Sequence, residues 1–402
     1  MSSVQEYTVE ILFSETKDVP SSFDNLMTIP PDSIKSLLIT ESVLTLLPKI
    51  ELVVADKGTF LEGNPLSDKD VLHVSLNNQL DLTDTEIYTP FMVSSVTATS
   101  DSFENQGVYI KVVGYMAADN AFSPYKYNAI NGSSDTVIRK IALEMGLKFK
   151  ADATGSESNY WYQNGNNYQY IKHVANRSYV PQDGVFVYGT LDGTINYTTI
   201  KTRMALDNIF TGVFDRDHVQ NNVLLDEDLP YMYYDGYEIV DLSETYNNMC
   251  NYGGVVNKYN LLEYVEDPLV NLDKTTDLSN KRESYTTSPV FSDNLGIIGS
   301  KPLQDTIYNG KLQNTFTKYQ LFSNSISINI NNSTNVSLFD KVDLAVPSLI
   351  DGDSIAEPYS GEYVVASISH SIVLNAGYAK RVLLCRNGIN KSVLKKDYNG
   401  VV

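Results

Sequence analysis

Alternation of apolar and polar residues marks several short strands in the first 117 or so residues. A period of two is typical of half-buried β-strands, and their close spacing indicates an antiparallel sandwich or barrel. One strand ends at Asp56-Lys57-Gly58, where Gly58 can supply the positive φ of a turn. The segment Asp32–Leu47 fits one short helix or another strand equally well. The alternating segments are Tyr7–Phe13, Lys49–Val54, Val71–Leu76 and Val108–Val113.

The pattern changes near residue 133 from strand periodicity to helix periodicity. Val137, Ile138, Ile141 and Met145 fall at helical spacing, and Gly146 lies where a helix commonly ends. A second helix is predicted from about Asn167 to Arg177. Asp192-Gly193, between two apolar runs, predicts a β-hairpin. Residues 118–205 therefore form an expected α/β insert.

Residues 206–320 are rich in Asn, Asp and Tyr and predict no clear element. Period-two strands return after residue 320, so a second β-rich block closes the chain. The predicted fold class is mainly β with an α/β insert. The late strands are Ser325–Ile330, Val342–Pro347, Glu362–His370 and Arg381–Arg386.

The composition excludes several classes of protein. No apolar run approaches the roughly 18 residues of a membrane helix, and no secretory signal is visible at the N-terminus. We therefore expect a soluble protein made in a cytoplasm. Thirty Lys and Arg against 49 Asp and Glu give a net charge of −19, which disfavours sequence-specific binding of nucleic acid. The 28 tyrosines suit half-buried sheet positions and interfaces, or platforms for sugars.

Candidate chemistry is sparse. Two distant cysteines, Cys250 and Cys385, exclude a disulfide framework and a four-Cys zinc site. Asp215–His218, Asp226–Asp228 and Asp351–Asp353 lack the spacing of a catalytic or calcium-binding motif, and we interpret them as exposed loops. Neither the Gly-x-Ser-x-Gly nor the phosphate-binding Gly-x-x-x-x-Gly-Lys-Ser/Thr motif occurs. We predict no catalytic residue, no metal and no cofactor.

Three stretches, in this order, resemble the baseplate hub proteins of contractile phage tails, a family that includes the hub part of type VI secretion spikes. Together they cover roughly half of the chain. They are Ala55–Leu66; the helix ending at Gly146 with Trp161–Gly165, Tyr168–Ala175 and the Asp192-Gly193 hairpin; and Gly361–Ile372 continued by Gly377-Tyr378 to Gly388.

The resemblance implies two tube-like antiparallel β-barrel domains, at 1–117 and 321–402, with the α/β insert at 118–205 between them. Residues 206–320 would be an irregular part of the second tube domain plus an insertion. His370 and Trp161 are expected to be packed structural residues. The positions that carry the resemblance, all expected to be structural, are Asp56, Gly58, Gly146, Trp161, Gln163, Asp192, Gly193, Gly361, Tyr363, His370, Gly377 and Tyr378.

A hub of this family would form a homotrimeric ring in the virion, with no enzymatic activity and no membrane insertion. Its expected partners are a spike protein, a tail tube or tube-initiator protein and the surrounding baseplate proteins. The tape measure and the DNA would pass through the lumen without specific binding. Three alternatives stay open: a carbohydrate-binding host-recognition protein, a cell-wall hydrolase that uses Asp or Glu pairs, and a tail-tip protein of a non-contractile phage.

Overall fold

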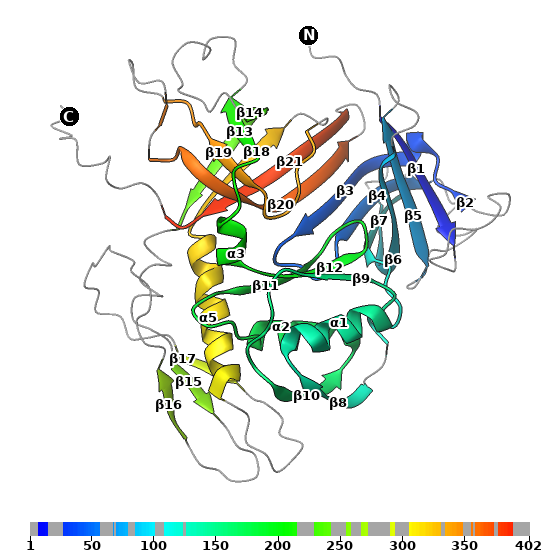
Figure 1. Cartoon of the computed structure of the whole chain (residues 1–402). Coiled ribbons are helices and arrows are strands. Elements are labelled where there is room, and N and C mark those ends of the chain that lie inside the picture. The colour runs from blue at the N-terminus through cyan, green and yellow to red at the C-terminus, as the bar shows by residue number, and fades with distance from the viewer. Residues whose placement is uncertain are drawn as a thin grey trace.

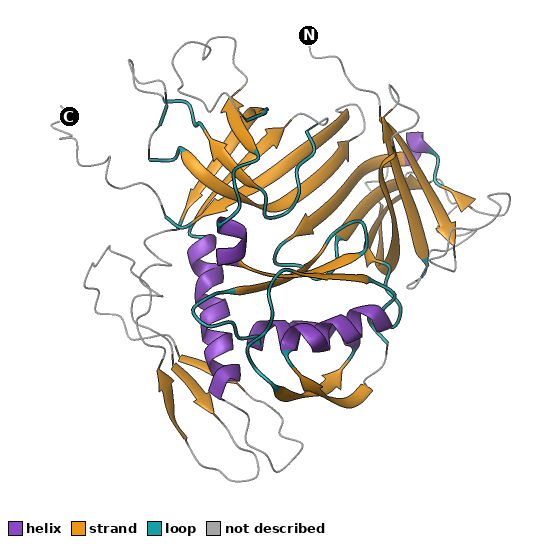
Figure 2. Cartoon of the chain, in the orientation of Figure 1, coloured by secondary structure: helices purple, strands orange, loops and turns teal. Residues whose placement is uncertain are grey.

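The computed structural model describes most of the chain and is mainly β, which confirms the predicted fold class. Figures 1 and 2 show two strand-rich parts side by side, with the helices gathered below them. The described residues are 7–14, 27–56, 67, 70–78, 85–100, 108–123, 126–214, 229–242, 255–258, 267–271, 290–293, 305–330, 334–348, 355–356, 358–373 and 377–388.

The first part, here called the N-terminal sheet, has the strand order β3-β4-β7-β6-β5-β1-β2. All of its pairings are antiparallel. The undecided segment after Asp32 is a strand. Every second residue from Leu37 onward is buried, and Leu37 and Ile39 both point into the core. A 3₁₀ turn, η1 (Pro31–Ser33), precedes it. The strands are β1 (Tyr7–Ser14), β2 (Met27–Thr28), β3 (Ile34–Ser42), β4 (Lys49–Asp56), β5 (Val71–Asn78), β6 (Thr85–Ser100) and β7 (Val108–Met116).

The second part, here called the C-terminal barrel, is a closed barrel of six strands in the order β19-β13-β14-β18-β21-β20. The pairing of β19 with β20 closes it. One feature differs from the expected antiparallel barrel: β13 runs parallel to both of its neighbours. Parallel neighbours need a long connection, and the bounds of the two strands leave room for one, since β13 ends at Phe214 and β14 begins at Tyr231. The strands are β13 (Phe210–Phe214), β14 (Tyr231–Asp241), β18 (Asn324–Ile330), β19 (Lys341–Leu344), β20 (Gly361–Val373) and β21 (Gly377–Arg386).

In the sequence, the α/β insert lies between the two β parts. Both predicted helices are confirmed: the apolar stripe of α1 and Tyr170, Ile171 and Val174 of α2 are buried. Asn166 caps α2, since its Oδ1 accepts from the Gln169 amide at 2.8 Å. The elements are β8 (Lys126–Gly132), α1 (Ser134–Glu144), β9 (Lys148–Ala151), β10 (Asn159–Gly165), α2 (Asn167–Arg177), β11 (Val185–Gly189), β12 (Thr194–Thr199) and α3 (Ile200–Met204).

The stretch that the sequence left unassigned contains a small sheet and a long helix. The helix α5 (Asp305–Leu321) packs beside α2 and leads directly into β18 (Figure 1). The small sheet has the order β16-β15-β17, with β15 (Val255–Lys258), β16 (Asp267–Asn271) and β17 (Val290–Asp293).

The two β parts repeat one topology. Taken in chain order, β3, β4, β5, β6 and β7 correspond to β14, β18, β19, β20 and β21. The spatial order is the same in both: β5-β6-β7-β4-β3 in the first and β19-β20-β21-β18-β14 in the second. Equivalent side chains fill both cores, such as Phe91 and Tyr363, or Val112 and Val382. The chain therefore contains an internal structural duplication.

Candidate assembly site at the joint between the two β parts

One antiparallel strand pair, β20 with β3, joins the two β parts into a continuous 13-stranded sheet. Its register runs from Ser367 opposite Ser42 to Val373 opposite Ser36. Side chains reinforce it: Ser367 Oγ donates to the Glu41 carbonyl at 2.8 Å, and Ser42 Oγ donates to the Ala366 carbonyl at 3.2 Å. The joint is thus a backbone-hydrogen-bonded seam within one chain.

A β-bulge divides β20 between its two partners. The register with β21 shifts between Val365 and Ser367, which leaves Ala366 as an extra residue. Before the bulge, Gly361–Val364 pair with β19 and close the barrel. After it, Ser367–Val373 leave β19 and pair with β3. A single strand therefore belongs to both β parts.

The β11–β12 hairpin of the insert lies against this joint. Alternate residues of β11 face different cores: Val185 packs in the core that the N-terminal sheet shares with the insert, and Phe186 and Tyr188 pack in that of the barrel. There, Phe339 meets the Phe186 ring edge-on, with centroids 5.1 Å apart. The hairpin therefore packs against both cores and fixes their relative position.

The tip of the hairpin is bound to the N-terminal sheet by hydrogen bonds. The Leu191 amide donates to Glu41 Oε2 at 3.1 Å, and Thr89 Oγ1 donates to the Leu191 carbonyl at 3.0 Å. The Gly189 amide donates to the Thr45 carbonyl at 3.3 Å. A Cβ at position 189 would overlap the Leu46 carbonyl oxygen, so this approach requires glycine.

Glu41 is a buried carboxyl group near one end of the joint, opposite Ile368, and is 8% exposed. Burial raises the pKa of Glu41 to about 7; the hydrogen bond from Leu191 and the charge of Lys380 lower it, and Asp192 raises it. Lys380 extends from β21, and its Nζ donates to the Thr334 carbonyl at 2.9 Å. Glu41 is therefore held by a backbone amide and balanced by one nearby cation.

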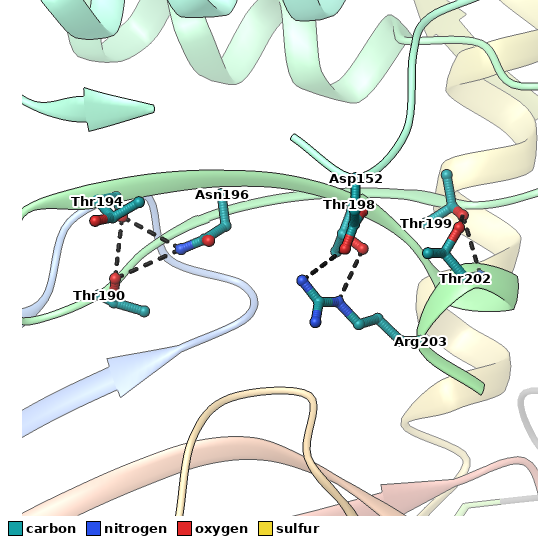
Figure 3. Close-up of polar contacts among 8 residues, drawn as sticks. All are labelled: Asp152, Thr190, Thr194, Asn196, Thr198, Thr199, Thr202 and Arg203. Carbon is teal, nitrogen blue, oxygen red and sulfur yellow. Dashed lines mark hydrogen bonds and ion pairs between the residues drawn. The ribbon is translucent and has the colours of Figure 1, made fainter. Parts of the chain in front are cut away.

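A row of polar side chains stabilises the hairpin and the helix that follows it (Figure 3). Near the turn, Asn196 Nδ2 donates to the Thr194 carbonyl at 3.4 Å. At the other end, Arg203 forms an ion pair with Asp152 at 2.7 Å, and its Nε donates to Thr198 Oγ1 at 3.0 Å. These contacts connect α3 with β12 and with the residue that follows β9.

Helix α5 is fixed to the insert by the buried Asn314. Its Oδ1 accepts from the Val185 amide at 2.8 Å, and its Nδ2 donates to the Ser178 carbonyl at 2.8 Å. Gly310 allows the close approach, since a Cβ there would lie 2.6 Å from the carbonyl oxygens of Arg177 and Ser178. One amide side chain thus joins α5, the end of α2 and the start of β11.

The residues expected from the resemblance lie in three places: at the end of β4, in the α/β insert, and at or near the joint. Asp56 is buried at the end of β4, and Gly58 lies outside the described residues. Gly146 follows α1 with a φ of 69°, and Trp161 is buried, its Nε1 donating to the Gly132 carbonyl at 2.9 Å. Gln163 is buried in β10, where its Nε2 donates to Asn167 Oδ1 at 3.0 Å.

The remaining expected residues lie at or near the joint. Asp192 and Gly193 form the hairpin turn, with Gly193 at a φ of 79°. Gly361 and Gly377 begin β20 and β21, and the buried Tyr363 hydroxyl donates to the Tyr359 carbonyl at 2.7 Å. His370 Nδ1 lies 2.6 Å from the Tyr378 hydroxyl. Burial, and then the charge of Lys380, lower the pKa of His370 to about 3, so this imidazole is neutral.

Sequence reasoning missed Glu41 and Asn314. A signal existed for Glu41, because it follows Leu37 and Ile39 on the apolar face of a period-two segment. Asn314 has no such signal, since its partners are backbone groups far away in the sequence.

The described residues contain no group of three His, Cys, Asp or Glu side chains placed to hold a metal ion. None of the described helices is long and apolar enough to cross a membrane.

Comparison with solved structures relates the chain to tail proteins. No protein-family model matches the sequence, and no curated protein is similar to it. The fold is similar to that of the 43 kDa tail protein of prophage MuSo2 from Shewanella oneidensis, with TM-score 0.56, 12% identity and coverage of 94% of this chain and 98% of that chain. A tail protein from Neisseria meningitidis MC58 aligns with TM-score 0.54 and 11% identity, over 95% of this chain and 97% of that chain. The chain thus has the fold of phage tail proteins, as the resemblance implied.

Proposed function

We propose that this chain is a structural, non-enzymatic component of a phage tail: the baseplate hub, a trimeric ring that joins the tail tube to the central spike. In this role it is part of the virion. It contacts the spike, the tube or tube initiator and the surrounding baseplate proteins, and its lumen lets the tape measure and DNA pass.

The internal duplication is the observation that carries this proposal. Three copies, each with two β parts of equal topology, present six similar modules to the tube and keep threefold symmetry for the spike. The similarity to two tail proteins over nearly the whole chain agrees with this role.

The charge of the chain fits a channel for DNA. Three copies of a chain with net charge −19 carry about −57, and acidic groups at the lumen would repel phosphates rather than bind them. This part of the proposal requires an acidic lumen, so a neutral or basic lumen in the assembled ring would remove it.

The four-part division and the roles of the motif residues belong to the same proposal. The proposed parts are 1–117, 118–205, 206–320 and 321–402. Within them, Gly146, Gly193 and Gly361 have positive φ at the ends or starts of elements, where glycine is favoured. We propose that these residues act by shaping the modules and not by binding a ligand.

Co-assembly tests the function. The chain should form a complex with the spike and tube proteins. The mass of this complex from light scattering should include three copies of the 44.8 kDa chain, which contribute about 134 kDa. A complex with one copy, or no complex, would contradict the hub role. Saturable glycan binding that is lost on Tyr substitution would instead support the host-recognition alternative.

A further inference from the structure

The long strands β6 and β20 are equivalent at the level of single residues. In β6 the register with β7 shifts between Val93 and Ser95, as it shifts in β20 between Val365 and Ser367. Both strands pair with their first neighbour only up to the bulge: β6 with β5 as far as Met92, and β20 with β19 as far as Val364. Beyond the bulge, Ser95 thus corresponds to Ser367.

The same holds for the strands β3 and β14. The register shifts between Ile34 and Ser36 in β3, and between Tyr234 and Gly236 in β14. Counting from these bulges, Thr40 corresponds to Val240. The equivalence is therefore fixed by four bulges and not by overall shape.

Within the chain, only one of these two equivalent edge pairs is made. Past the bulge, β20 pairs with β3, whereas in the described structure β6 has β7 alone as a partner there. Likewise β13 covers β14 only from Tyr231 to Tyr234. The second half of β6 and the second half of β14 are thus two half-paired edges that correspond to the two sides of the internal joint.

Exposure agrees with this difference. Residues 94–100 of β6 are all exposed, whereas of the seven equivalent residues of β20, 366–372, three are buried and four are half-buried. Apolar side chains remain on these edges: Val96 is 37% exposed, Val240 43% and Leu242 39%, whereas Ile368, the equivalent of Val96, is 1% exposed. Exposed strand edges with apolar residues favour pairing with another strand.

We infer that the second half of β6 in one copy pairs, antiparallel, with the second half of β14 in the next copy. The register copies that of the internal joint: Ser95 lies opposite Leu242, Thr97 opposite Val240 and Thr99 opposite Glu238 of the partner. This inference rests on the proposed ring and supplies its contact between copies. The ring then alternates an internal and an intermolecular version of the same seam.

The positions of the two edges exclude pairing within one chain. Strand β14 is in the barrel wall opposite β20, three strands away in either direction, while β6 lies in the other β part. Figure 1 shows β14 and β6 on opposite sides of the β20–β3 joint. Each edge therefore points to a different neighbour, as head-to-tail contacts in a ring require.

Disulfide trapping tests the register. At the internal joint, Thr40 Oγ1 and Ser369 Oγ lie 3.4 Å apart, so equivalent side chains at 97 and 240 are close enough for a disulfide. We expect Thr97→Cys/Val240→Cys, in a Cys250→Ser background, to give disulfide-linked trimers on oxidation of the complex with spike and tube. The matched control is Thr97→Cys/Leu242→Cys, on the same face but displaced along β14, which should cross-link at least several-fold less.

The outcomes separate the inference from the function. A trimer by light scattering, with equal or no cross-linking of the two pairs, would overturn the inferred seam and leave the hub role intact. A complex without three copies would overturn both. Thr97, Val240 and Leu242 are exposed, so unchanged thermal unfolding relative to the Cys250→Ser background is the expected control result.

Discussion

Glu41 of β3 and Asp241 of β14 occupy equivalent positions in the two β parts, at the same distance from equivalent β-bulges. Their surroundings differ: β20 and the hairpin tip cover Glu41, whereas Asp241 is exposed. One of the two equivalent strand edges, that of β3, is thus paired within the chain, and the other, that of β14, is exposed.

Replacing Glu41 with Gln should change how stability depends on pH. Burial raises the folded-state pKa of Glu41 from 4.5 to about 7, so the folded chain binds more protons than the unfolded chain between these values. Stability therefore falls as pH rises through this window, by up to about 3 kcal/mol. Glu41→Gln keeps an acceptor for the Leu191 amide and removes this loss.

Urea unfolding of wild type and Glu41→Gln at about pH 5 and about pH 8 measures the effect. The variant should gain stability relative to wild type as pH rises. Glu51→Gln is the control, because Lys111 and Lys49 lower the pKa of Glu51 and its ionised form is the favoured one. If Glu51→Gln behaved like Glu41→Gln, burial of Glu41 would not be the cause.

Two glycines of the hairpin should respond differently to alanine. Gly189→Ala places a methyl group against the Leu46 carbonyl, and separating the hairpin from the joint should cost about 3 kcal/mol. Gly193→Ala meets no atom within 4 Å and strains only a backbone with a φ of 79°, at a cost of about 1 kcal/mol. Thermal unfolding of both variants gives the comparison, and equal losses would contradict the close approach at Gly189.

Asn314→Ala should destabilise the attachment of α5. The substitution leaves the buried Val185 amide and the Ser178 carbonyl without this partner, at a cost of about 3 kcal/mol. Hydrogen exchange should show faster exchange of the Val185 amide. Thr315→Ala is the matched control, since Thr315 Oγ1 donates within its own helix to Lys311, and a similar loss there would refute the special role of Asn314.

The ion pair between Arg203 and Asp152 should contribute modestly. Both side chains are partly exposed, at 18% and 26%, so a double-mutant cycle with Arg203→Ala and Asp152→Ala should give a coupling of about 1 kcal/mol or less. Added salt should reduce it. A coupling that salt does not change would indicate that Arg203 acts through packing and its bond to Thr198 instead.

An element can be predicted from the sequence when one of its faces is apolar and is buried within the same chain. Strand β4 and helix α2 are readable because each buries one face inside the chain. Helix α5 is not, since Gly310 and the polar Asn314 make close contacts among its few buried apolar residues. The exposed half of β6 alternates only weakly, through Val96 and Ala98, and Ser94–Ser100 have no buried face in one copy.

The site was less predictable than the fold. Turn chemistry located the hairpin tip at Asp192-Gly193, but nothing nearby in sequence shows that the tip meets Glu41, about 150 residues away. The resemblance implied two similar β domains, but a comparison of the two halves residue by residue does not reveal them, because equivalent positions such as Phe91 and Tyr363 share burial and register but not residue type.

The division of β20 between two partners also determines the order in which strands can pair while the chain is being synthesised. Leu37 and Ile39 of β3 leave the ribosome long before β20 (Gly361–Val373), the strand that covers their edge. Until then the edge of β3 is bare and open to wrong pairing with other nascent chains. Translation of β20 therefore supplies, in one step, the strand that pairs with β19 in the barrel and with the edge of β3.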